Sequence, residues 1–388
     1  MNPRDVVIVS ACRTPIGKNM GQFKDVRARQ LAITAGAEAI KRADIDPKLI
    51  DGIVMGECFT AMEGSLAARQ VSMRLGFDER SNACVVNQNC ASGMRALDIQ
   101  ANNILLGKED IGMVIGVESM TNAPYVLEKA RMGYRMGDSK IFDNMLHDGL
   151  IDELSGGHMG LTAENVAEKY GITREECDKI AVRSHNLACK AIDEGIFKDE
   201  IVPVVIKSKK GEKVITDDEH PIRGCTMETL AKLKPAFKKD GVITAANASG
   251  INDAAAAVIL MSWEKCQELG KKPMAKLVTC VAEGVAPEVM GLGPAVAMPK
   301  ALKAAGLKWE DIDYFEVNEA FSAQVLGVER MLKEDYGYVV DWDKTNKFGS
   351  GIALGHPVGC TALRIIVTLV YEMIRSDYKY GMASLCVG

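Results

Sequence analysis

The sequence predicts an α/β protein built from two related halves, with a polar segment inserted between them. Three observations support this fold class: apolar runs alternate with amphipathic segments near both ends, one region repeats another, and the composition changes across residues 121–250. The 388 residues also exceed the length of one ordinary domain.

The first half, residues 1–120, alternates strands and helices. The apolar run 6–12 reads as the first strand, and 39–57 (AIKRADIDPKLIDGIVMGE) reads as a helix end, a turn and a buried strand. Residues 85–97 indicate a strand, a tight turn and a helix, and 111–117 indicate another strand. Such alternation is typical of sheets with mostly parallel strands.

The second half, residues 272–388, repeats the first. Residues 301–319 (ALKAAGLKWEDIDYFEVNE) align with 39–57 without a gap, and Asp51 and Asp313 are among the identical pairs. A second match, in the same order, pairs residues 94–95 and 112–113 with 363–364 and 381–382. Chance explains one such match between helix–strand units, whereas two in the same order predict a duplication.

Residues 121–250 form the predicted insert, a loop domain that faces the ligand. The apolar run 251–262 (INDAAAAVILMS) then returns to a strand pattern, so we expect it to complete the first sheet and assign 251–266 to the first half. The second half reaches residue 388 directly after its last matching strand, so the duplication predicts one more closing strand for the second sheet.

Composition excludes several classes of protein. A hydrophobic content of 47% with 26% charged residues excludes disorder and fibrous repeats. The net charge of −5 argues against a nucleic-acid or anionic-membrane partner. No run of about 18 apolar residues occurs, so no membrane-spanning helix is expected. The eleven cysteines include no C-x-x-C pair, so we expect reduced thiols in the cytoplasm and no metal site.

Candidate functional residues follow strands in both halves, where the loops of α/β sheets hold ligands. Cys90 lies where a strand turns into a helix, whose N-terminus lowers a thiol pKa. Asn318 ends a buried strand in EVNEAFSAQ, and His356 lies on the stiff glycine-rich loop GIALGHPVG. Cys386 ends the last strand of the second half. A cysteine beside a positioned histidine is the pattern of an activated nucleophile.

Each of these residues also has a structural interpretation. Cys90 could be a buried core cysteine, Asn318 a helix cap and His356 a solvated loop residue. Phosphate-binding motifs are missing: the sequence contains no P-loop, no complete dinucleotide-binding glycine loop and no G-x-S-x-G.

In these segments the chain resembles the thiolases, acyl-CoA acetyltransferases built from a duplicated α/β half with an inserted loop domain. The motifs N-x-x-C-x-S-G, N-E-A-F, G-H-P-x-G and a terminal C-x-G occur in that order, and the resemblance covers essentially the whole chain. It implies two mixed five-stranded sheets in a layered α-β-α-β-α arrangement. The chain departs from the usual pattern at Ala91, where the family has glycine, and in extra residues near 335–344.

The resemblance implies a catalytic role for each motif residue. Cys90 would be the nucleophile that carries the acetyl group, and His356 the base that activates it. Cys386 would be the acid/base for the α-proton of the second acetyl-CoA. Asn318 would hold a water that forms one oxyanion hole with His356, and the backbone N–H groups of Cys90 and Gly388 would form the other.

The resemblance also assigns the substrate site. GGHMGLTAENVA (156–167) is similar to the substrate loop of the acetoacetyl-CoA type, in which His158 and Met159 line the acyl pocket. Ser249 would lie near the pantetheine. Arg223 follows Ile222, which occupies the aligned position of a phosphate-contacting arginine. The other residues assigned to substrate binding are Leu150, Phe237, Met290 and Phe321.

The implied activity is that of an acetyl-CoA C-acetyltransferase, which joins two acetyl-CoA into acetoacetyl-CoA plus CoA by a reversible ping-pong Claisen condensation. The CoA thioesters would be substrates, and no other cofactor is expected. The alternatives are a broader-chain 3-oxoacyl-CoA thiolase and a non-catalytic acyl-CoA-binding scaffold. Residues 130–137 (ARMGYRMG) resemble a tetramer-assembly loop, so a homotetramer is expected, without nucleic-acid or membrane partners. Oxidation is expected to join Cys90 and Cys386.

Overall fold

The computed structural model describes residues 1–209 and 211–387, and its first half is built around one seven-stranded mixed sheet. The strands follow the order β13-β1-β12-β5-β3-β4, and β2 pairs with β12. β12 runs antiparallel to β1 and β5, whereas β3 runs parallel to β5 and β4. The strands are β1 (Val6–Arg13), β2 (Gly17–Lys18), β3 (Gly52–Gly56), β4 (Asn82–Val86), β5 (Ile111–Ser119), β12 (Asn252–Ser262) and β13 (Ala275–Lys276).

The central strands of this sheet are covered on both faces. Every residue of β1, β3, β5 and β12 is buried, which explains why these strands read as continuous apolar runs. Helices α1 (Ala28–Ala43) and α2 (Ala67–Arg74) pack on one face. Helices α3 (Ser92–Leu105) and α11 (Val358–Ser376) pack on the other. The returning strand predicted at 251–262 is confirmed as β12, inside the first sheet.

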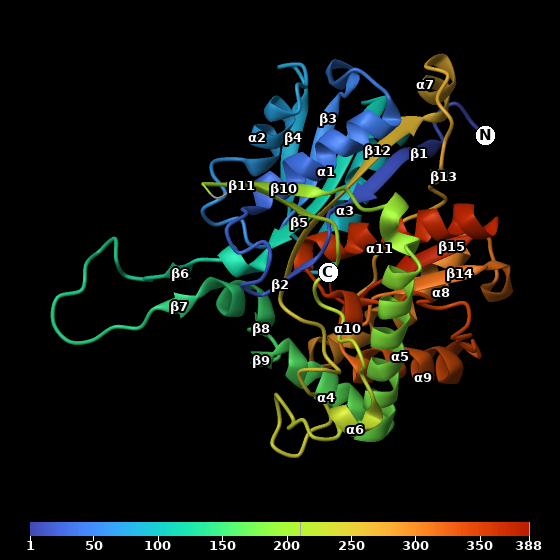
Figure 1. Cartoon of the computed structure of the whole chain (residues 1–388). Helices are drawn as coiled ribbons and strands as arrows, with labels where there is room; N and C mark the ends of the chain where they lie inside the picture. Colours follow the sequence, from blue (N-terminus) through green and yellow to red (C-terminus); the bar gives the residue numbers. More distant parts are fainter. Residues whose placement is uncertain (210, 388) are drawn as a thin grey trace.

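The second half lies below the first, with α11 between the two sheets (Figure 1). Its strands β14 (Tyr314–Val317) and β15 (Gly381–Ser384) pair in parallel. The expected second sheet of five strands is not formed in the described residues. Those residues include no counterpart of β12 in the second sheet, and residues 277–286 form no strand. The helices of this half are α8 (Gly293–Ala305), α9 (Ser322–Tyr336) and α10 (Gly351–Leu354).

The duplication is visible in hydrogen bonds. The Asp51 carboxylate accepts from the backbone N–H groups of residues 110 and 111, at 2.8 and 3.0 Å. The Asp313 carboxylate accepts from residues 379 and 380 at the same two distances. Asp51 directly precedes β3 and links it to the start of β5, its neighbour in the sheet. Asp313 directly precedes β14 and links it in the same way to the start of β15. The repeat predicted from the sequence therefore builds the same link in both halves.

The insert is more regular than a loop domain. It contains the helices α4 (Met159–Tyr170) and α5 (Arg174–Asp193), and Thr173 and Glu176 form a capping box at the start of α5. Its hairpins pair β6 (Tyr125–Val126) with β7 (Phe142–Asp143), β8 (Ile151–Asp152) with β9 (Gly157–His158), and β10 (Val204–Ser208) with β11 (Gly211–Ile215). The segment between β6 and β7 projects far from the body (Figure 1).

Short helices complete the described chain. They are η1 (Pro47–Leu49), η2 (Met120–Asn122), η3 (Leu146–Leu150), η4 (Ile196–Asp199), α6 (Met227–Leu230), α7 (Trp263–Glu268), η5 (Pro287–Leu292) and η6 (Trp309–Asp311). Across residues 1–209 and 211–387, no helix combines the length and apolar character needed to cross a membrane.

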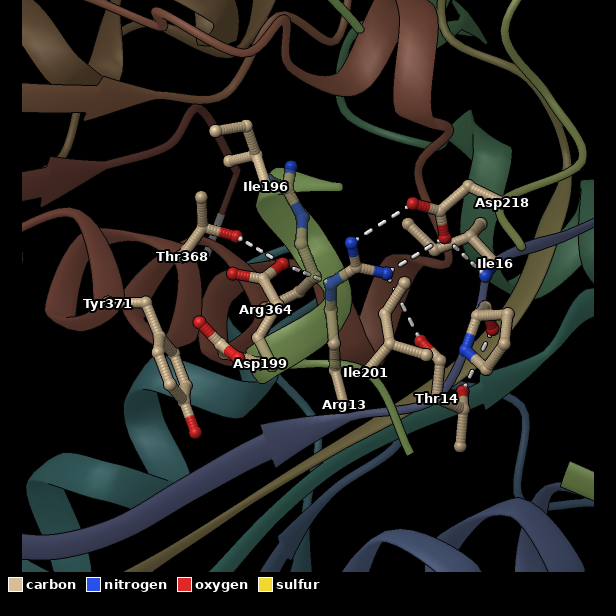
Figure 2. A network of polar contacts seen from close by, with 12 residues as sticks. Arg13, Thr14, Ile16, Ile196, Asp199, Ile201, Asp218, Arg364, Thr368 and Tyr371 are labelled. Carbon is tan, nitrogen blue, oxygen red and sulfur yellow. Dashed lines mark hydrogen bonds and ion pairs between the residues drawn. The ribbon is translucent and has the colours of Figure 1, made fainter. Parts of the chain in front are cut away.

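A buried ion cluster joins the insert to both halves. Arg13, at the end of β1, is fully buried and donates to Glu200 at 2.5 Å and to Asp218 at 2.8 and 3.0 Å. Thr368 of α11 donates to Glu200 at 3.1 Å. Figure 2 shows Arg13 directed toward Asp218, with Thr368 on the other side. The Arg13 guanidinium therefore links β1 and the insert, and Glu200 extends this link to α11 in the second half.

Candidate active site

Cys90 lies in the turn between β4 and α3, and hydrogen bonds hold that turn. Asn89 has a left-handed backbone (φ 44°), and its carbonyl accepts from the N–H and the hydroxyl of Ser92 at 3.0 and 2.7 Å. The Ser92 hydroxyl in turn accepts from the Gln88 N–H at 2.8 Å. Gly56 lets α3 approach closely, because a Cβ there would lie 2.4 Å from the Ser92 carbonyl carbon. The turn fixes Cys90 at the carboxyl end of the first sheet.

His356 is in contact with the Cys90 thiol. Its Nε2 lies 3.1 Å from Cys90 Sγ, and its Nδ1 lies 2.6 Å from the Thr361 hydroxyl. That hydroxyl donates its only hydrogen to the Pro357 carbonyl at 2.9 Å, so it accepts from Nδ1–H. We therefore assign the tautomer that leaves the Nε2 lone pair facing the thiol.

The His356 ring is neutral. Burial lowers its pKa to about 3, and the nearby Arg364 charge acts in the same direction. A neutral ring with a free lone pair can accept the proton of a thiol. The structural interpretation of His356 as a solvated loop residue is wrong, because only 6% of the residue is exposed.

Cys386 lies beside Cys90 in the same buried site. The hydrogen bond between the thiols raises the pKa of Cys90, burial raises it further, and the same bond lowers the pKa of Cys386. The Ala91 N–H donates to the Val387 carbonyl at 2.9 Å, which holds the two segments together. Both thiols are free, and their oxidative pairing stays a prediction.

The direction of the Cys90 pKa shift corrects the sequence expectation. The helix N-terminus was expected to lower this pKa, yet α3 begins two residues later, at Ser92. The hydrogen bond to Cys386 and burial raise the pKa of Cys90 well above its usual value. Cys90 therefore needs a base to remove its proton, and His356 is in position to do so.

Asn318 is a buried amide without a partner among the described residues. It is fully buried after β14, and neither its Oδ1 nor its Nδ2 makes a hydrogen bond. A Cβ at Gly351 would lie 2.5 Å from Oδ1, so the adjacent chain has room only for glycine. Asn318 is not a helix cap, because α9 begins at Ser322 with Phe321 as its N-cap. A buried amide without a partner is costly, so this side chain is suited to bind water or ligand.

Three predicted substrate residues form an aromatic row. The His158 ring stacks on Phe237 at 4.7 Å between centroids, and Phe237 meets Phe321 edge to face at 6.0 Å. His158 Nδ1 accepts from the Gly160 N–H at 3.0 Å, which caps α4 and fixes the ring. Burial lowers the pKa of His158.

The structure places most other predicted substrate residues close to this row. Met159, Phe237 and Met290 pack against the apolar cluster that includes Phe321 and Cys386. Leu150 and Cys90 both pack against another cluster, formed by Phe59, Met120 and Val358. The Ser249 N–H donates to the Ala320 carbonyl at 2.8 Å, directly beside the N-E-A-F motif.

One predicted residue, Arg223, is paired elsewhere on the surface, and another, Gly388, is not among the described residues. Arg223 makes a paired ion contact with Asp193 at 2.8 and 3.0 Å, and its side chain is 61% exposed. Gly388, predicted for one oxyanion hole, lies outside the described residues.

Sequence reasoning missed two polar residues that hold the site. Glu118 in β5 is fully buried and accepts from the N–H groups of Cys58, Phe59 and Gly359 at 2.8 to 3.1 Å. Asn252, the first residue of β12, accepts from the His356 N–H at 2.9 Å. Both residues could have been found in the sequence, because each is a polar residue within a strand that is otherwise apolar. A polar side chain buried in such a strand needs hydrogen-bond partners.

Family comparisons agree with this fold and site. The family model for the thiolase N-terminal domain matches residues 6–264, and the model for the thiolase C-terminal domain matches 271–388. The chain belongs to the thiolase family. The fold shared with its relatives is the duplicated thiolase fold implied by the sequence motifs.

Individual relatives cover almost the whole chain. An acetyl-CoA acetyltransferase of Syntrophomonas wolfei is 51% identical, and one of Cupriavidus necator is 45% identical; each match covers 99% of this chain and 96% of the relative. A solved acetyl-CoA acetyltransferase structure from S. wolfei, 63% identical, has a TM-score of 0.99 over 100% of this chain and 97% of that one. The human mitochondrial 3-ketoacyl-CoA thiolase, 38% identical, has a TM-score of 0.94 over the same shares.

Proposed function

We propose that this protein is an acetyl-CoA C-acetyltransferase, which condenses two acetyl-CoA into acetoacetyl-CoA plus CoA and catalyses the reverse thiolysis. The contact of 3.1 Å between Cys90 Sγ and His356 Nε2, with Cys386 beside it, carries the proposal. Relatives named acetyl-CoA acetyltransferase, at 45–51% identity over nearly the full chain, support it.

The first half-reaction transfers an acetyl group to Cys90. His356 Nε2 takes the thiol proton while Sγ attacks the thioester carbonyl of acetyl-CoA. The tetrahedral oxyanion collapses, the C–S bond to CoA breaks, and the His356 imidazolium returns its proton to the departing CoA thiolate. The products are free CoA and acetyl-Cys90.

The second half-reaction forms the carbon–carbon bond. The Cys386 thiolate, favoured by its lowered pKa, removes an α-proton from the second acetyl-CoA. The resulting enolate attacks the carbonyl of acetyl-Cys90, and the Cys90 thiolate leaves as acetoacetyl-CoA forms. The proton on Cys386 then passes to Cys90, which restores the resting pair.

Both half-reactions develop negative charge on an oxygen. Preorganised donors at that oxygen are commonly the largest single contribution to such catalysis. Asn318, whose amide has no partner among the described residues, is proposed to hold a water that forms one oxyanion hole with His356. The N–H groups of Cys90 and Gly388 are proposed for the other.

The substrate is proposed to be a short acyl-CoA. His158, Phe237 and Phe321 pack as a row of rings, which is proposed to form one wall of the acyl pocket and to limit the length of the acyl chain. Met159, Met290, Leu150 and Ser249 are proposed as its other contacts. Arg223 is proposed to leave Asp193 for a CoA phosphate, since an exposed ion pair is weak.

Thiolysis rates test this proposal. We expect purified protein to cleave acetoacetyl-CoA with CoA at least about tenfold faster than it cleaves longer 3-oxoacyl-CoAs. Intact-mass measurement after mixing with acetyl-CoA should show one acetyl group, lost in Cys90→Ser. Faster cleavage of longer chains would favour the second candidate, a broader 3-oxoacyl-CoA thiolase like the human structural relative. No acetyl adduct and no turnover would favour a non-catalytic scaffold.

The chemistry above uses proton transfers and two thiols, so we propose that it needs no metal or further cofactor. Dialysis against EDTA is then expected to leave thiolysis unchanged. We also propose a cytoplasmic location, which suits eleven cysteines that are all free among the described residues. Neither a nucleic acid nor a membrane is proposed as a partner.

We propose a homotetramer, a dimer of dimers. The projecting segment between β6 and β7 exposes large apolar side chains, Met136 being 99% exposed. β4 lies at the edge of the first sheet, where a second copy can pair with it. Light scattering should give the tetramer mass, and replacing residues 129–139 with a short glycine–serine turn should give dimers. A monomeric wild-type protein would contradict the proposal.

A further inference from the structure

The backbone that carries His356 depends on Asn252. Gly355 has a φ of 98°, and a Cβ at this glycine would lie 2.5 to 2.6 Å from the amide carbon, nitrogen and oxygen of Asn252. The Asn252 Oδ1 accepts from the His356 N–H at 2.9 Å. Asn252 is fully buried at the start of β12, so it holds this turn from a rigid strand of the first sheet.

The orientation of the Asn252 amide is itself determined. Its Nδ2 donates to the Gly17 carbonyl at 2.9 Å and lies 3.3 Å from His220 Nδ1. A flipped amide would present its oxygen to the Gly17 carbonyl and its nitrogen to the His356 N–H, losing both hydrogen bonds. His220 Nδ1 therefore serves as an acceptor.

His220 connects the insert to the same turn. Its ring packs against Gly250, where a Cβ would lie 2.2 Å from Cε1. Burial lowers the pKa of His220, and a hydrogen bond to the Ile352 carbonyl opposes this shift. Ile352 belongs to α10, directly before the His356 turn. His220 therefore contacts both Asn252 and α10, the two groups that flank the catalytic histidine.

We propose that Asn252 and His220 are positioning residues that set the distance between His356 Nε2 and Cys90 Sγ. Thr361 orients the ring of His356 but not its backbone, whose N–H group is held by Asn252 of the first half. A base acts only within hydrogen-bond reach of the proton it removes, so a shift of the turn weakens it. The inference rests on the proposed function, because it takes His356 as the base for Cys90.

Two measurements test the positioning role. Asn252→Ala is expected to lower kcat for thiolysis about 10- to 100-fold while KM changes less than about twofold, because a displaced base affects chemistry and not binding. The pH profile of Cys90 alkylation by iodoacetamide should shift toward that of His356→Ala. His220→Ala should shift both readouts in the same direction by a smaller factor.

Conservative variants separate positioning from folding. Asn252→Asp keeps an acceptor for the His356 N–H, and His220→Asn keeps one for the Asn252 amide, so each should recover part of the loss. The matched control is Asn102→Ala, which removes an exposed amide bonded to Asp98 within α3 and should leave kcat and alkylation within about twofold. Thermal unfolding shows whether each variant is folded. If Asn252→Ala does not fold, the kcat and alkylation profiles of Asn252→Asp and His220→Asn test the positioning role instead.

The outcomes are distinct. Folded Asn252→Ala and His220→Ala with the wild-type kcat and alkylation profile would overturn the inference. A lower melting temperature with an unchanged alkylation profile would assign a merely structural role and overturn it as well. Alkylation needs no substrate, so it decides the positioning role even if wild-type protein shows no thiolysis, a result that would refute only the proposed function.

Discussion

At the scale of single residues, three groups share the protons of the site. His356 is neutral because it is buried, Cys90 keeps its proton because a second sulfur and burial raise its pKa, and Cys386 has a lowered pKa. In this resting state the His356 base and the Cys90 thiol are both uncharged, so the proton transfer between them can wait until substrate is bound. Because the pKa values of Cys90 and Cys386 shift in opposite directions, replacing one or the other is expected to impair different half-reactions.

Cys386→Ala is expected to separate the half-reactions. Acetyl transfer from acetyl-CoA to Cys90 should persist, because Cys90 and His356 remain, whereas condensation should fall about 10²- to 10⁴-fold without the group proposed to remove the α-proton. Rapid-quench mass measurement reports the acetyl adduct, and coupled assays report acetoacetyl-CoA. Loss of the adduct in this variant, with the fold intact, would contradict the assigned roles.

Glu57 carries a buried carboxyl group without a partner among the described residues. Burial raises its pKa to about 9, with the Glu118 and Glu63 charges in the same direction and Arg29 opposed. The folded state therefore binds one more proton than the unfolded state between pH 4.5 and 9, so stability falls as pH rises through this range.

Glu57→Gln is expected to remove that penalty. At pH 8 the free energy of unfolding of the variant should exceed that of wild type by up to about 5 kcal/mol, and the difference should shrink toward zero near pH 4.5. Urea unfolding at several pH values measures this. A constant difference at all pH values would show that Glu57 does not titrate as described.

At the scale of elements, each half ties its sheet with the same aspartate. Asp51 and Asp313 stand before β3 and β14, and each accepts two backbone N–H groups at the start of a neighbouring strand. Helix ends also correspond, since α1 and α8 both terminate in a left-handed residue, Asp44 or Gly306. The repeated sequence therefore forms equivalent hydrogen bonds in the two halves.

Asp51→Ala and Asp313→Ala should therefore cost similar stability. Each removes two hydrogen bonds to a partly exposed carboxylate, so we expect a loss of about 1–3 kcal/mol from either substitution and little change in kcat. Urea unfolding compares the two variants directly. A large difference between them would mean that the two halves no longer use this link equally.

At the scale of the whole molecule, Arg13 joins the insert to both halves. Its guanidinium is fully buried between Glu200 and Asp218, and the two carboxylates raise its pKa against the effect of burial. Such a cluster is stable only while every charge has a partner.

Arg13→Met should destabilise the protein strongly. Two buried carboxylates would lose their cation, at a cost of about 3–5 kcal/mol. Asp218→Asn, which keeps the size and one acceptor, should cost less. Thermal unfolding measures both, and equal melting temperatures for Arg13→Met and wild type would contradict the role of the cluster.

Much of this fold could be predicted from local sequence. The returning strand β12 and the repeat were visible because apolar periodicity and identity are local signals. The helices α4 and α5 were missed because the polar composition of the insert was read as loops, although Thr173 and Glu176 have capping-box spacing. The second sheet has two described strands, because strand formation depends on a neighbour as well as on the strand's own residues.

The order of the elements, the duplication and the residue types able to perform acyl transfer can all be read from the amino-acid sequence. The behaviour of those residues depends on contacts that form only in the folded chain. Cys90 and His356 are 266 positions apart, and the pKa values of Cys90 and Cys386 shift in opposite directions through their mutual hydrogen bond. Burial and hydrogen bonding between distant segments set these properties, because desolvation and contact exist only after the chain has folded.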